Sequence, residues 1–434
     1  MTSTSKKLKG KINSLSGEIT IPGDKSITHR AIIFSSIAEG KSKIDGISLG
    51  ADCISTINAF RAMGIKIEIK KNRAVVEGKG INGLNEPADV IDAGNSGTTI
   101  RLLTGLLAGQ KFLSIITGDS SLRRRPMARI IKPLKLMGAN ITARANNTLA
   151  PIVIKGRKLH SIKYSLPISS AQVKTAIILA ALQAEGITEI IEPSKSRDHT
   201  ERMLKYFGGN IKVSGRHIFV KKNETPFKAR DFSIPGDFSS AAFFIAAATL
   251  IENAKLIIRG VGINRTRTGF LQALRKMGGN FKIINRTSKC GEPCADIVVE
   301  ASKLKAMRFP KSLVPFTIDE FPIIFVLASL AEGTSVFEGI KELRYKESDR
   351  ISVMAKGLSN MGVEVSEGDD WIKIKGAKKL KGALIESNGD HRIAMSFSIA
   401  ALCAEGTTTI KDAGCINISF PQFYSLLRKI TAGR

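Results

Sequence analysis

The stretch "IPGDKSITHRA" (residues 21–31) returns in altered form about half a chain later, as "IPGDFSSAAFF" (residues 234–244). Both copies open with the same four residues, but only the first continues into a lysine, a histidine and an arginine. A chain of 434 residues is longer than one hydrophobic core normally serves, so about two domains are expected. The repeated phrase therefore predicts two related halves.

A finer repeat runs through both halves. A helix-like stretch that ends in a small-residue turn occurs six times at intervals of about 72 residues, which is longer than the units of most solenoid proteins. A second helix end, glycine followed by strand-like alternation, recurs out of phase, as in "AMGIKIEI" (62–69) and "KMGGNFKI" (276–283). Six units, with the opening phrase repeated after three, predict two domains of three units each. The turns are at Gly40, Gly109, Gly186, Asn253, Gly333 and Gly406.

Small polar residues that can cap a helix precede the first helix of each unit. These leaders are "PGDKS" (22–26), "GNSGTT" (94–99), "SSAQVK" (169–174), "PGDFSS" (235–240), "IDEFP" (318–322) and "GDHR" (389–392). We interpret "PGDFSS" as a cap only, because a run of apolar residues follows it. The other leaders hold more charged and amide groups than capping requires. Because helix N-termini attract anions, several of them facing one cleft would form a strong anion site.

The net charge of +28 also favours anionic partners. Nucleic acid is disfavoured, because the 66 Lys and Arg residues are dispersed along the chain and only 6% of the residues are aromatic. Cations near the leaders suit phosphate and carboxylate, and acids in the same setting stay ionised and suit general base work. The cations are Lys25, Arg30, Arg101, Arg125, Lys346, Arg350 and Arg392, and the acids are Asp319 and Glu347.

Several classes of protein fit poorly. The five cysteines, an odd and scattered set, argue against a disulfide framework, and "CGEPC" (290–294) lacks the second ligand pair of a zinc site. No apolar run of about 18 residues and no secretory leader is present, so we expect a cytoplasmic protein that does not bind membranes. Two near matches to nucleotide-binding loops fail at Ser35 and Arg265, where glycine is required.

The leaders, together with other phrases in the same order, resemble the 5-enolpyruvylshikimate-3-phosphate synthase (3-phosphoshikimate 1-carboxyvinyltransferase) family over essentially the whole chain. The other phrases are "GDSSLRRRPM" (118–127), "RDHTERML" (197–204), "NRTR" (264–267) and "KESDR" (346–350). "SAQVK", "RDHTE" and "NRTR" resemble the bacterial class II branch.

The resemblance implies an α/β fold of two inverse α/β, barrel-like domains, each made of three βαβαββ repeats. The domains would be residues 22–235, and residues 1–21 plus 236–434. Two crossovers, near residues 21–24 and 234–237, would join them, so both "IPGD" phrases would mark the places where the chain changes domain.

The implied reaction transfers the enolpyruvyl group of phosphoenolpyruvate to the 5-hydroxyl of shikimate 3-phosphate and releases phosphate. No metal or organic cofactor is implied, and we expect a monomer whose partners are these two small anions. By resemblance, Asp319 is the base for the 5-hydroxyl, and Glu347 and Lys25 exchange the proton at the methylene carbon. The implied shikimate 3-phosphate contacts are Lys25, Ser26, Arg30, Ser170, Gln172, Arg197, Asp319 and Lys346. The implied phosphoenolpyruvate contacts are Lys25, Gly97, Arg125, Gln172, Arg350 and Arg392.

Two positions bear on how far the family pattern holds. Many members carry a lysine where this chain has Ile418, which removes one expected phosphoenolpyruvate contact. Insensitive class II members carry alanine where this chain has Gly97, so we expect inhibition by glyphosate, the family's inhibitor at the phosphoenolpyruvate site.

The sequence leaves two alternatives. The first is the sister enolpyruvyl transferase that acts on UDP-N-acetylglucosamine. That family has Lys-Asn in place of Lys25-Ser26 and usually a reactive cysteine in the loop that here reads "GDSSLRRRPM". The second is a basic RNA-binding repeat protein without activity, which leaves Asp319 and Glu347 unexplained.

Overall fold

The computed structural model describes residues 5–431, and the chain divides into two compact units. Unit 1 joins the N-terminal segment up to Pro22 to Pro235–Ser288 and to the chain from Pro293 onward. Unit 2 comprises Gly23–Ile234 and Lys289–Glu292. The chain therefore changes unit inside each copy of "IPGD".

The first of these crossings requires glycine. A Cβ atom on Gly23 would lie 1.6 Å from the carbonyl oxygen of Gly46 and 3.1 Å from the Cγ2 atom of Ile234. No side chain fits so close to a backbone oxygen, so the glycine of the phrase has a direct packing reason.

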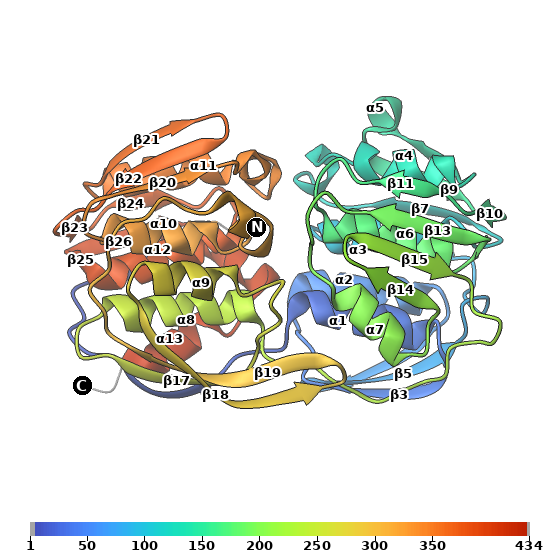
Figure 1. The fold of residues 1–434 in the computed structure, drawn as a ribbon, viewed down its shortest axis with the longest axis horizontal. Helices are drawn as coiled ribbons and strands as arrows, with labels where there is room; N and C mark the ends of the chain where they lie inside the picture. The colour runs from blue at the N-terminus through green and yellow to red at the C-terminus, as the bar shows by residue number, and fades with distance from the viewer. Residues whose placement is uncertain (1–4, 432–434) are drawn as a thin grey trace. The chain divides into compact units, whose positions relative to one another are not determined.

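Unit 2 has three sheets of one pattern (Figure 1). Its strands are β3 (Glu39–Asp45), β4 (Lys66–Lys70), β5 (Arg73–Lys79), β6 (Ile91–Asp92), β7 (Leu113–Thr117), β8 (Asn140–Ala143), β9 (Leu149–Lys155), β10 (Leu159–His160), β11 (Lys163–Ser165), β12 (Ala184–Glu185), β13 (Ile187–Ile191), β14 (Ile211–Ser214), β15 (His217–Lys221) and β16 (Phe232–Ser233). The strand orders are β16-β3-β5-β4, β6-β7-β9-β8 and β11-β13-β15-β14, with β10 and β12 as a separate pair. In each four-stranded sheet the first pair is parallel and the other two are antiparallel. This threefold recurrence matches the repeat in the sequence.

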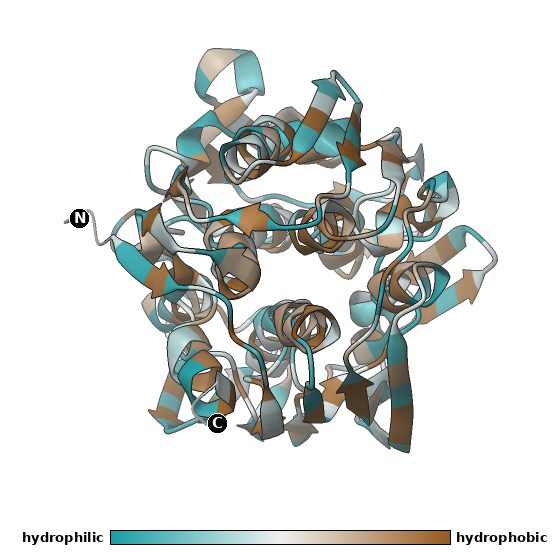
Figure 2. Ribbon diagram, turned by 90° about the vertical axis from the view of Figure 1, so that its left-hand side faces the viewer, coloured by the Kyte–Doolittle hydropathy of each residue, from teal (hydrophilic) through white to brown (hydrophobic). Residues whose placement is uncertain are grey.

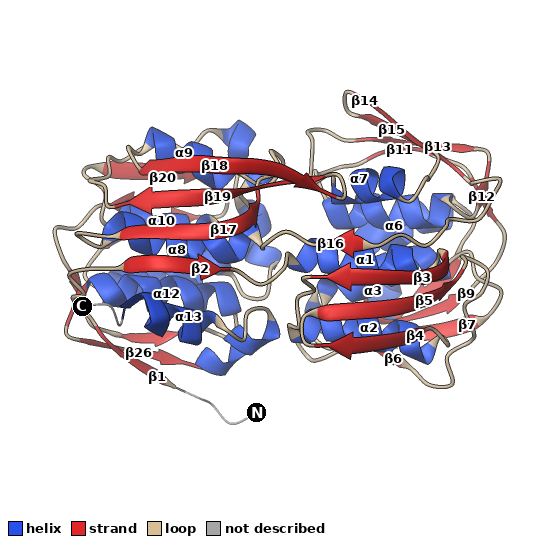
Figure 3. Ribbon diagram, turned by 90° about the horizontal axis from the view of Figure 1, so that it is seen from below, coloured by secondary structure: helices blue, strands red, loops and turns tan. Residues whose placement is uncertain are grey.

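Unit 1 repeats the arrangement in part, with one sheet of four strands and two of three strands among the described residues, and its N-terminal strand completes the last sheet. Its strands are β1 (Lys6–Lys9), β2 (Ser16–Thr20), β17 (Lys255–Gly262), β18 (Asn280–Lys289), β19 (Glu292–Glu300), β20 (Thr334–Glu338), β21 (Glu364–Gly368), β22 (Trp371–Lys375), β23 (Leu380–Lys381), β24 (Leu384–Glu386), β25 (Ala404–Glu405) and β26 (Thr407–Lys411). The orders are β18-β19-β17-β2, β20-β22-β21 and β1-β26-β24, with β23 and β25 as a pair. Figure 3 shows β2, β17, β19 and β18 side by side on one face of this unit.

The helices of each unit pack against its sheets, the most deeply buried of them inside the unit. Those of unit 2 are α1 (Lys25–Ser36), α2 (Ala51–Ala62), α3 (Gly97–Leu107), α4 (Ala128–Leu136), α5 (Arg144–Asn147), α6 (Ala171–Ala181) and α7 (His199–Tyr206), with the 3-10 turn η1 (Leu122–Arg124). Those of unit 1 are α8 (Phe238–Leu250), α9 (Gly269–Lys276), α10 (Phe321–Ser329), α11 (Arg350–Asn360), α12 (His391–Cys403) and α13 (Phe423–Thr431), with the 3-10 turns η2 (Lys311–Phe316), η3 (Lys341–Tyr345) and η4 (Ala413–Ile418). Buried apolar residues form one core cluster in each unit. Figure 2 shows hydrophobic residues concentrated along the helices that the sheets enclose.

The predicted leaders lie at the starts of α1, α3, α6, α8, α10 and α12, which are the most deeply buried helices of the two units. In five of the six the residue before the helix accepts a hydrogen bond from a backbone N–H of the first turn. Glu320, before α10, makes no such cap. The core helices therefore begin where the sequence predicts.

Candidate active site

Lys25, on the first turn of α1, is paired with a carboxylate. Its Nζ lies 3.0 Å from Oδ2 of Asp52 in the first turn of α2, and the two side chains are 16% and 10% exposed. Asp52 could not be selected from the sequence, because it is one of several acids near a helix start. The ion pair holds the lysine ammonium at the N-terminus of α1, where an anion could also bind the free backbone N–H groups of the helix.

Arg30 lies one turn deeper in α1 and is held on three sides. Its Nε donates to Oγ1 of Thr200 at 2.7 Å, its Nη2 to Oγ1 of Thr175 at 2.9 Å, and its Nη1 to the carbonyl oxygen of Ser26 at 2.9 Å. Burial lowers the pKa of Arg30 to about 10 even though the Glu201 carboxylate opposes the shift. The guanidinium is thus fixed and remains charged at neutral pH.

A second cationic group surrounds Gly97 at the start of α3. Arg101 Nη1 donates to Oε1 of Gln172 at 2.6 Å, and Gln172 Nε2 donates to Oγ1 of Thr98 at 3.0 Å. Arg125 Nη2 donates to Oδ1 of Asn95 at 2.6 Å. A Cβ atom on Gly97 would lie 3.1 Å from Arg101 Nη1 and 3.4 Å from Arg125 Nη1, so both guanidinium groups approach this glycine.

Ser170 and Arg197 are the remaining predicted residues of unit 2. Ser170 caps α6, its Oγ accepting from the backbone N–H of Val173 at 3.4 Å. Arg197 is partly buried before α7 and close enough to Arg30 to lower the pKa of that guanidinium.

Lys174, Glu192 and Glu201 form a buried ion triad in unit 2 that the sequence did not predict. Lys174 is fully buried on α6, with its Nζ 3.2 Å from Glu192 Oε2 and 2.6 Å from Glu201 Oε1. Burial raises the pKa of Glu201, while Lys174 acts in the opposite direction. The triad ties α6 to α7, whose Thr175 and Thr200 hold Arg30.

In unit 1, Asp319 lies between two arginines. Its Oδ1 is 3.6 Å from Nη1 of Arg350, and its Oδ2 is 3.7 Å from Nη2 of Arg392. Arg392 Nη1 also donates to the Asp319 carbonyl oxygen at 3.0 Å. The Asp319 side chain is 17% exposed, so it is oriented by cations and still reachable.

Arg350 is nearly fully buried and is held by two further carboxylates. Its Nε donates to Oδ2 of Asp390 at 2.8 Å and its Nη2 to Oε2 of Glu347 at 2.6 Å. Burial acts to raise the pKa of Asp390, but the Arg350 charge outweighs burial and the pKa is lowered. Within residues 5–431, Arg350 Nη1 has no hydrogen-bond acceptor and is therefore a donor that an incoming anion could use.

Lys346 precedes α11 and interacts with the same group. Burial lowers its pKa, whereas the carboxylates of Asp319 and Glu342 oppose the shift. Its Nζ lies 3.9 Å from Glu342 Oε1. A lysine with a lowered pKa gives up and takes back a proton more readily near neutral pH.

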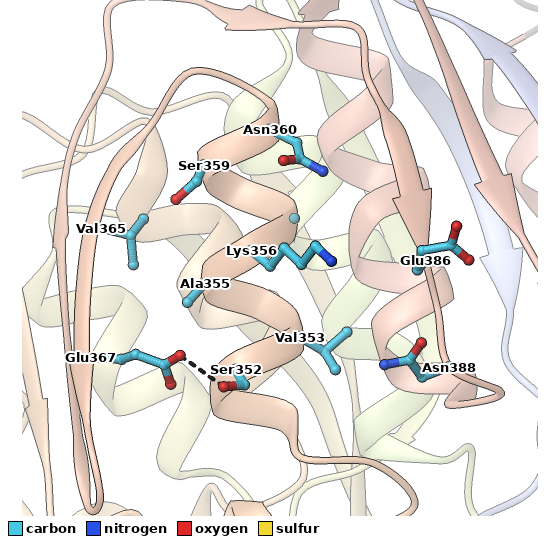
Figure 4. Close-up of a pocket in the computed structure, with 11 residues that line it drawn as sticks. Ser352, Val353, Ala355, Lys356, Ser359, Asn360, Val365, Glu367, Glu386 and Asn388 are labelled. Carbon is cyan, nitrogen blue, oxygen red and sulfur yellow. Dashed lines mark hydrogen bonds between the residues drawn. The ribbon is translucent and has the colours of Figure 1, made fainter.

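Two other features lie apart from the predicted residues. A pocket of about 530 Å³ lies between α11, β21 and β24 (Figure 4). Its lining includes Ser352, Lys356, Glu367, Glu386 and Asn388, and none of the predicted site residues. Ile418 ends η4 and is partly buried. Over the described part of the chain no group of three or more His, Cys, Asp or Glu could hold a metal, and no helix is long and apolar enough to cross a membrane.

Known proteins share the sequence phrases that lie at these helix starts. Residues 9–427 match the EPSP synthase (3-phosphoshikimate 1-carboxyvinyltransferase) family. The chain belongs to this family. The matched range includes most of both units and every residue predicted for the site.

Individual members of the EPSP synthase family match over almost their full length. A 3-phosphoshikimate 1-carboxyvinyltransferase of Thermodesulfovibrio yellowstonii is 51% identical over 422 residues, covering 97% of this chain and 98% of that protein. One of Geotalea uraniireducens is 50% identical over 417 residues, covering 96% and 97%.

Solved structures agree with the sequence match. The structure of EPSP synthase from Acinetobacter baumannii has a TM-score of 0.88 and 44% identity, covering 99% of this chain and 98% of that one. The enolpyruvyl transferase NikO from Streptomyces tendae has a TM-score of 0.79 at 17% identity, which shows the shared fold alone. The predicted inverse α/β fold of the enolpyruvyl transferases is therefore confirmed.

Proposed function

We propose that this protein is a 3-phosphoshikimate 1-carboxyvinyltransferase, with phosphoenolpyruvate and shikimate 3-phosphate as substrates. The whole-length similarity to enzymes of that name supports the proposal. The observation that carries it at the level of the site is Asp319, a carboxylate held between Arg350 and Arg392 at the start of a buried helix. We further propose that the two units are the two domains, and that the protein acts in the cytoplasm as a monomer.

In the first step the 5-hydroxyl oxygen of shikimate 3-phosphate forms a bond to C2 of phosphoenolpyruvate. Asp319 takes the hydroxyl proton, and a proton is delivered to the methylene carbon, which becomes a methyl group. We assign this delivery to Lys25 and Glu347. The product is a tetrahedral intermediate that still carries both phosphates.

In the second step the C–O bond to the donor phosphate breaks and phosphate leaves. The methyl group loses a proton, which restores the double bond and yields the enolpyruvyl ether. Because both substrates are anionic throughout, fixed cations that neutralise phosphate and carboxylate lower the barrier for both steps. Arg125, Arg350 and Arg392 are assigned to phosphoenolpyruvate, and Lys25, Ser26 and Arg30 to shikimate 3-phosphate.

Phosphate release tests the proposal. The purified protein is incubated with phosphoenolpyruvate and either shikimate 3-phosphate or UDP-N-acetylglucosamine, and a reaction without acceptor serves as the control. We expect phosphate only with shikimate 3-phosphate. Release with UDP-N-acetylglucosamine alone would favour the sister transferase, and no release with either acceptor would refute the proposal.

Light scattering tests the proposed monomer. A mass of 46.8 kDa would support the monomer, and twice that mass would contradict it.

A further inference from the structure

The second copy of the opening phrase does more than cap a helix. Asp237 Oδ1 accepts from the backbone N–H of Ser240 at 3.0 Å, as Asp24 Oδ1 accepts from Ile27 at 2.9 Å in the first copy. The cap interpretation is right for Asp237, but it is incomplete. Two residues on, Ser239 occupies the place that Ser26 holds in the first copy.

Ser239 joins a buried polar network in unit 1. Its hydroxyl donates to Oε1 of Glu320 and accepts from Nη2 of Arg267 at 2.6 Å. The same Arg267 nitrogen lies 3.7 Å from Oδ1 of Asp237. Ser239, Glu320, Arg267 and Asp237 are 2%, 1%, 3% and 8% exposed, so these charges lie out of water.

Burying ions costs several kcal/mol for each, and apolar packing of the same volume is often at least as stable. Stability alone therefore gives no reason for a carboxylate and a guanidinium here. A requirement for one fixed arrangement of the backbone at the start of α10 does give a reason.

The network adjoins the proposed base. Glu320 directly follows Asp319 and is the N-cap residue of α10. On the other side, Arg392 donates to the Asp319 carbonyl oxygen at 3.0 Å. The pair Asp319–Glu320 is thus held at the Asp319 carbonyl by α12 and at the Glu320 carboxylate by α8.

We propose that Ser239, Arg267 and Glu320 are positioning residues for Asp319, an inference that rests on the proposed function. By fixing the Glu320 side chain they fix the peptide group that orients the Asp319 carboxylate toward Arg350 and Arg392. None of the three needs to contact substrate. A displacement of about 1 Å at a reacting group can cost about 100-fold in rate, so the arrangement matters for turnover and little for binding.

The test compares Glu320→Gln and Ser239→Ala with the control Ser240→Ala, which alters the neighbouring position on the same helix turn. The glutamine keeps an acceptor for Ser239 but removes the negative charge that the Ser239 hydroxyl links to Arg267. We expect kcat to fall about 100-fold in Glu320→Gln and about tenfold in Ser239→Ala, with both KM values within about threefold of wild type. The control should retain wild-type kcat.

Shikimate 3-phosphate binding by calorimetry and the melting temperature separate positioning from unfolding. Intact binding and melting with reduced kcat support the inference, and Ser239→Ala decides it if Glu320→Gln does not fold. The inference would be overturned if the wild type is active and both variants keep its kcat. It would also be overturned if the variants raise both KM values as their melting temperature falls. An inactive wild type would instead refute the proposed function.

Discussion

Replacing Arg350 by methionine removes the cation around which unit 1 gathers three carboxylates. Breaking one side of a buried ion pair typically costs about 3–5 kcal/mol, because the partner charge remains buried. Asp390 would still accept from Ser348 Oγ at 3.1 Å and from the backbone N–H of Arg392 at 2.9 Å. We therefore expect the lower end, about 3 kcal/mol. For a domain of about 200 residues this corresponds to a fall in melting temperature of about 6–12 °C.

The loss should depend on pH. In the wild type the folded pKa of Asp390 is lowered, so the stabilisation from its pair with Arg350 is full above the unfolded value near 3.9 and is lost only at lower pH. Without Arg350, burial and Glu347 both act to raise the pKa of Asp390. The penalty in the variant is then largest at neutral pH and shrinks as the carboxylate takes up a proton.

Thermal unfolding of both proteins at about pH 7.5 and about pH 5 measures the effect. The control is Lys356→Met, which removes a cation from the exposed side of the same helix and should change the melting temperature by less than about 2 °C. If the difference in melting temperature between wild type and Arg350→Met is the same at both pH values, the electrostatic reasoning is refuted. If Arg350→Met lowers the melting temperature no more than Lys356→Met does, the burial argument is refuted.

Three further substitutions test the site itself. Asp319→Asn should lower kcat by about 100-fold or more while shikimate 3-phosphate still binds, and near-normal turnover would remove Asp319 as the base. Arg125→Ala should raise KM for phosphoenolpyruvate by about tenfold and far more than KM for shikimate 3-phosphate; equal losses would mean that the two ligands are misassigned. Gly97→Ala places a methyl group 3.1 Å from Arg101 and 3.4 Å from Arg125, and should raise the glyphosate inhibition constant by about tenfold, which is about 1.4 kcal/mol. An unchanged constant at matched phosphoenolpyruvate saturation would place Gly97 away from the inhibitor.

Local patterns explain what the sequence predicted well. A capping residue and the helix it starts are only a few positions apart, so the six helix starts could be read directly. The turn glycines were also visible, though for different physical reasons. Gly186 has a left-handed φ of 85°, whereas a Cβ on Gly109 would lie 2.8 Å from the Cβ of Gln183, closer than two such atoms approach.

Pairings between distant segments could not be read in this way. Lys25 and Asp52 lie on different helices, and Lys174 meets its two glutamates through the packing of α6 on neighbouring segments. Arg267 belongs to the phrase "NRTR", but nothing in that phrase indicates that its guanidinium bonds to Ser239. The repeat did contain one usable signal, because aligning the two "IPGD" copies places Ser239 opposite Ser26.

The two copies of the opening phrase meet different partners. In the first copy, Lys25 pairs with the Asp52 carboxylate, and Arg30 is held by the hydroxyl groups of Thr175 and Thr200. In the second copy, Ser239 bonds to Glu320, the residue that follows Asp319. In unit 1, Asp319, Glu347 and Asp390 surround Arg350, and the pKa of Lys346 is lowered. Because carboxylates beside a lysine of lowered pKa suit proton transfer, the second copy, through Ser239, would hold in place the carboxylate that we propose as the base.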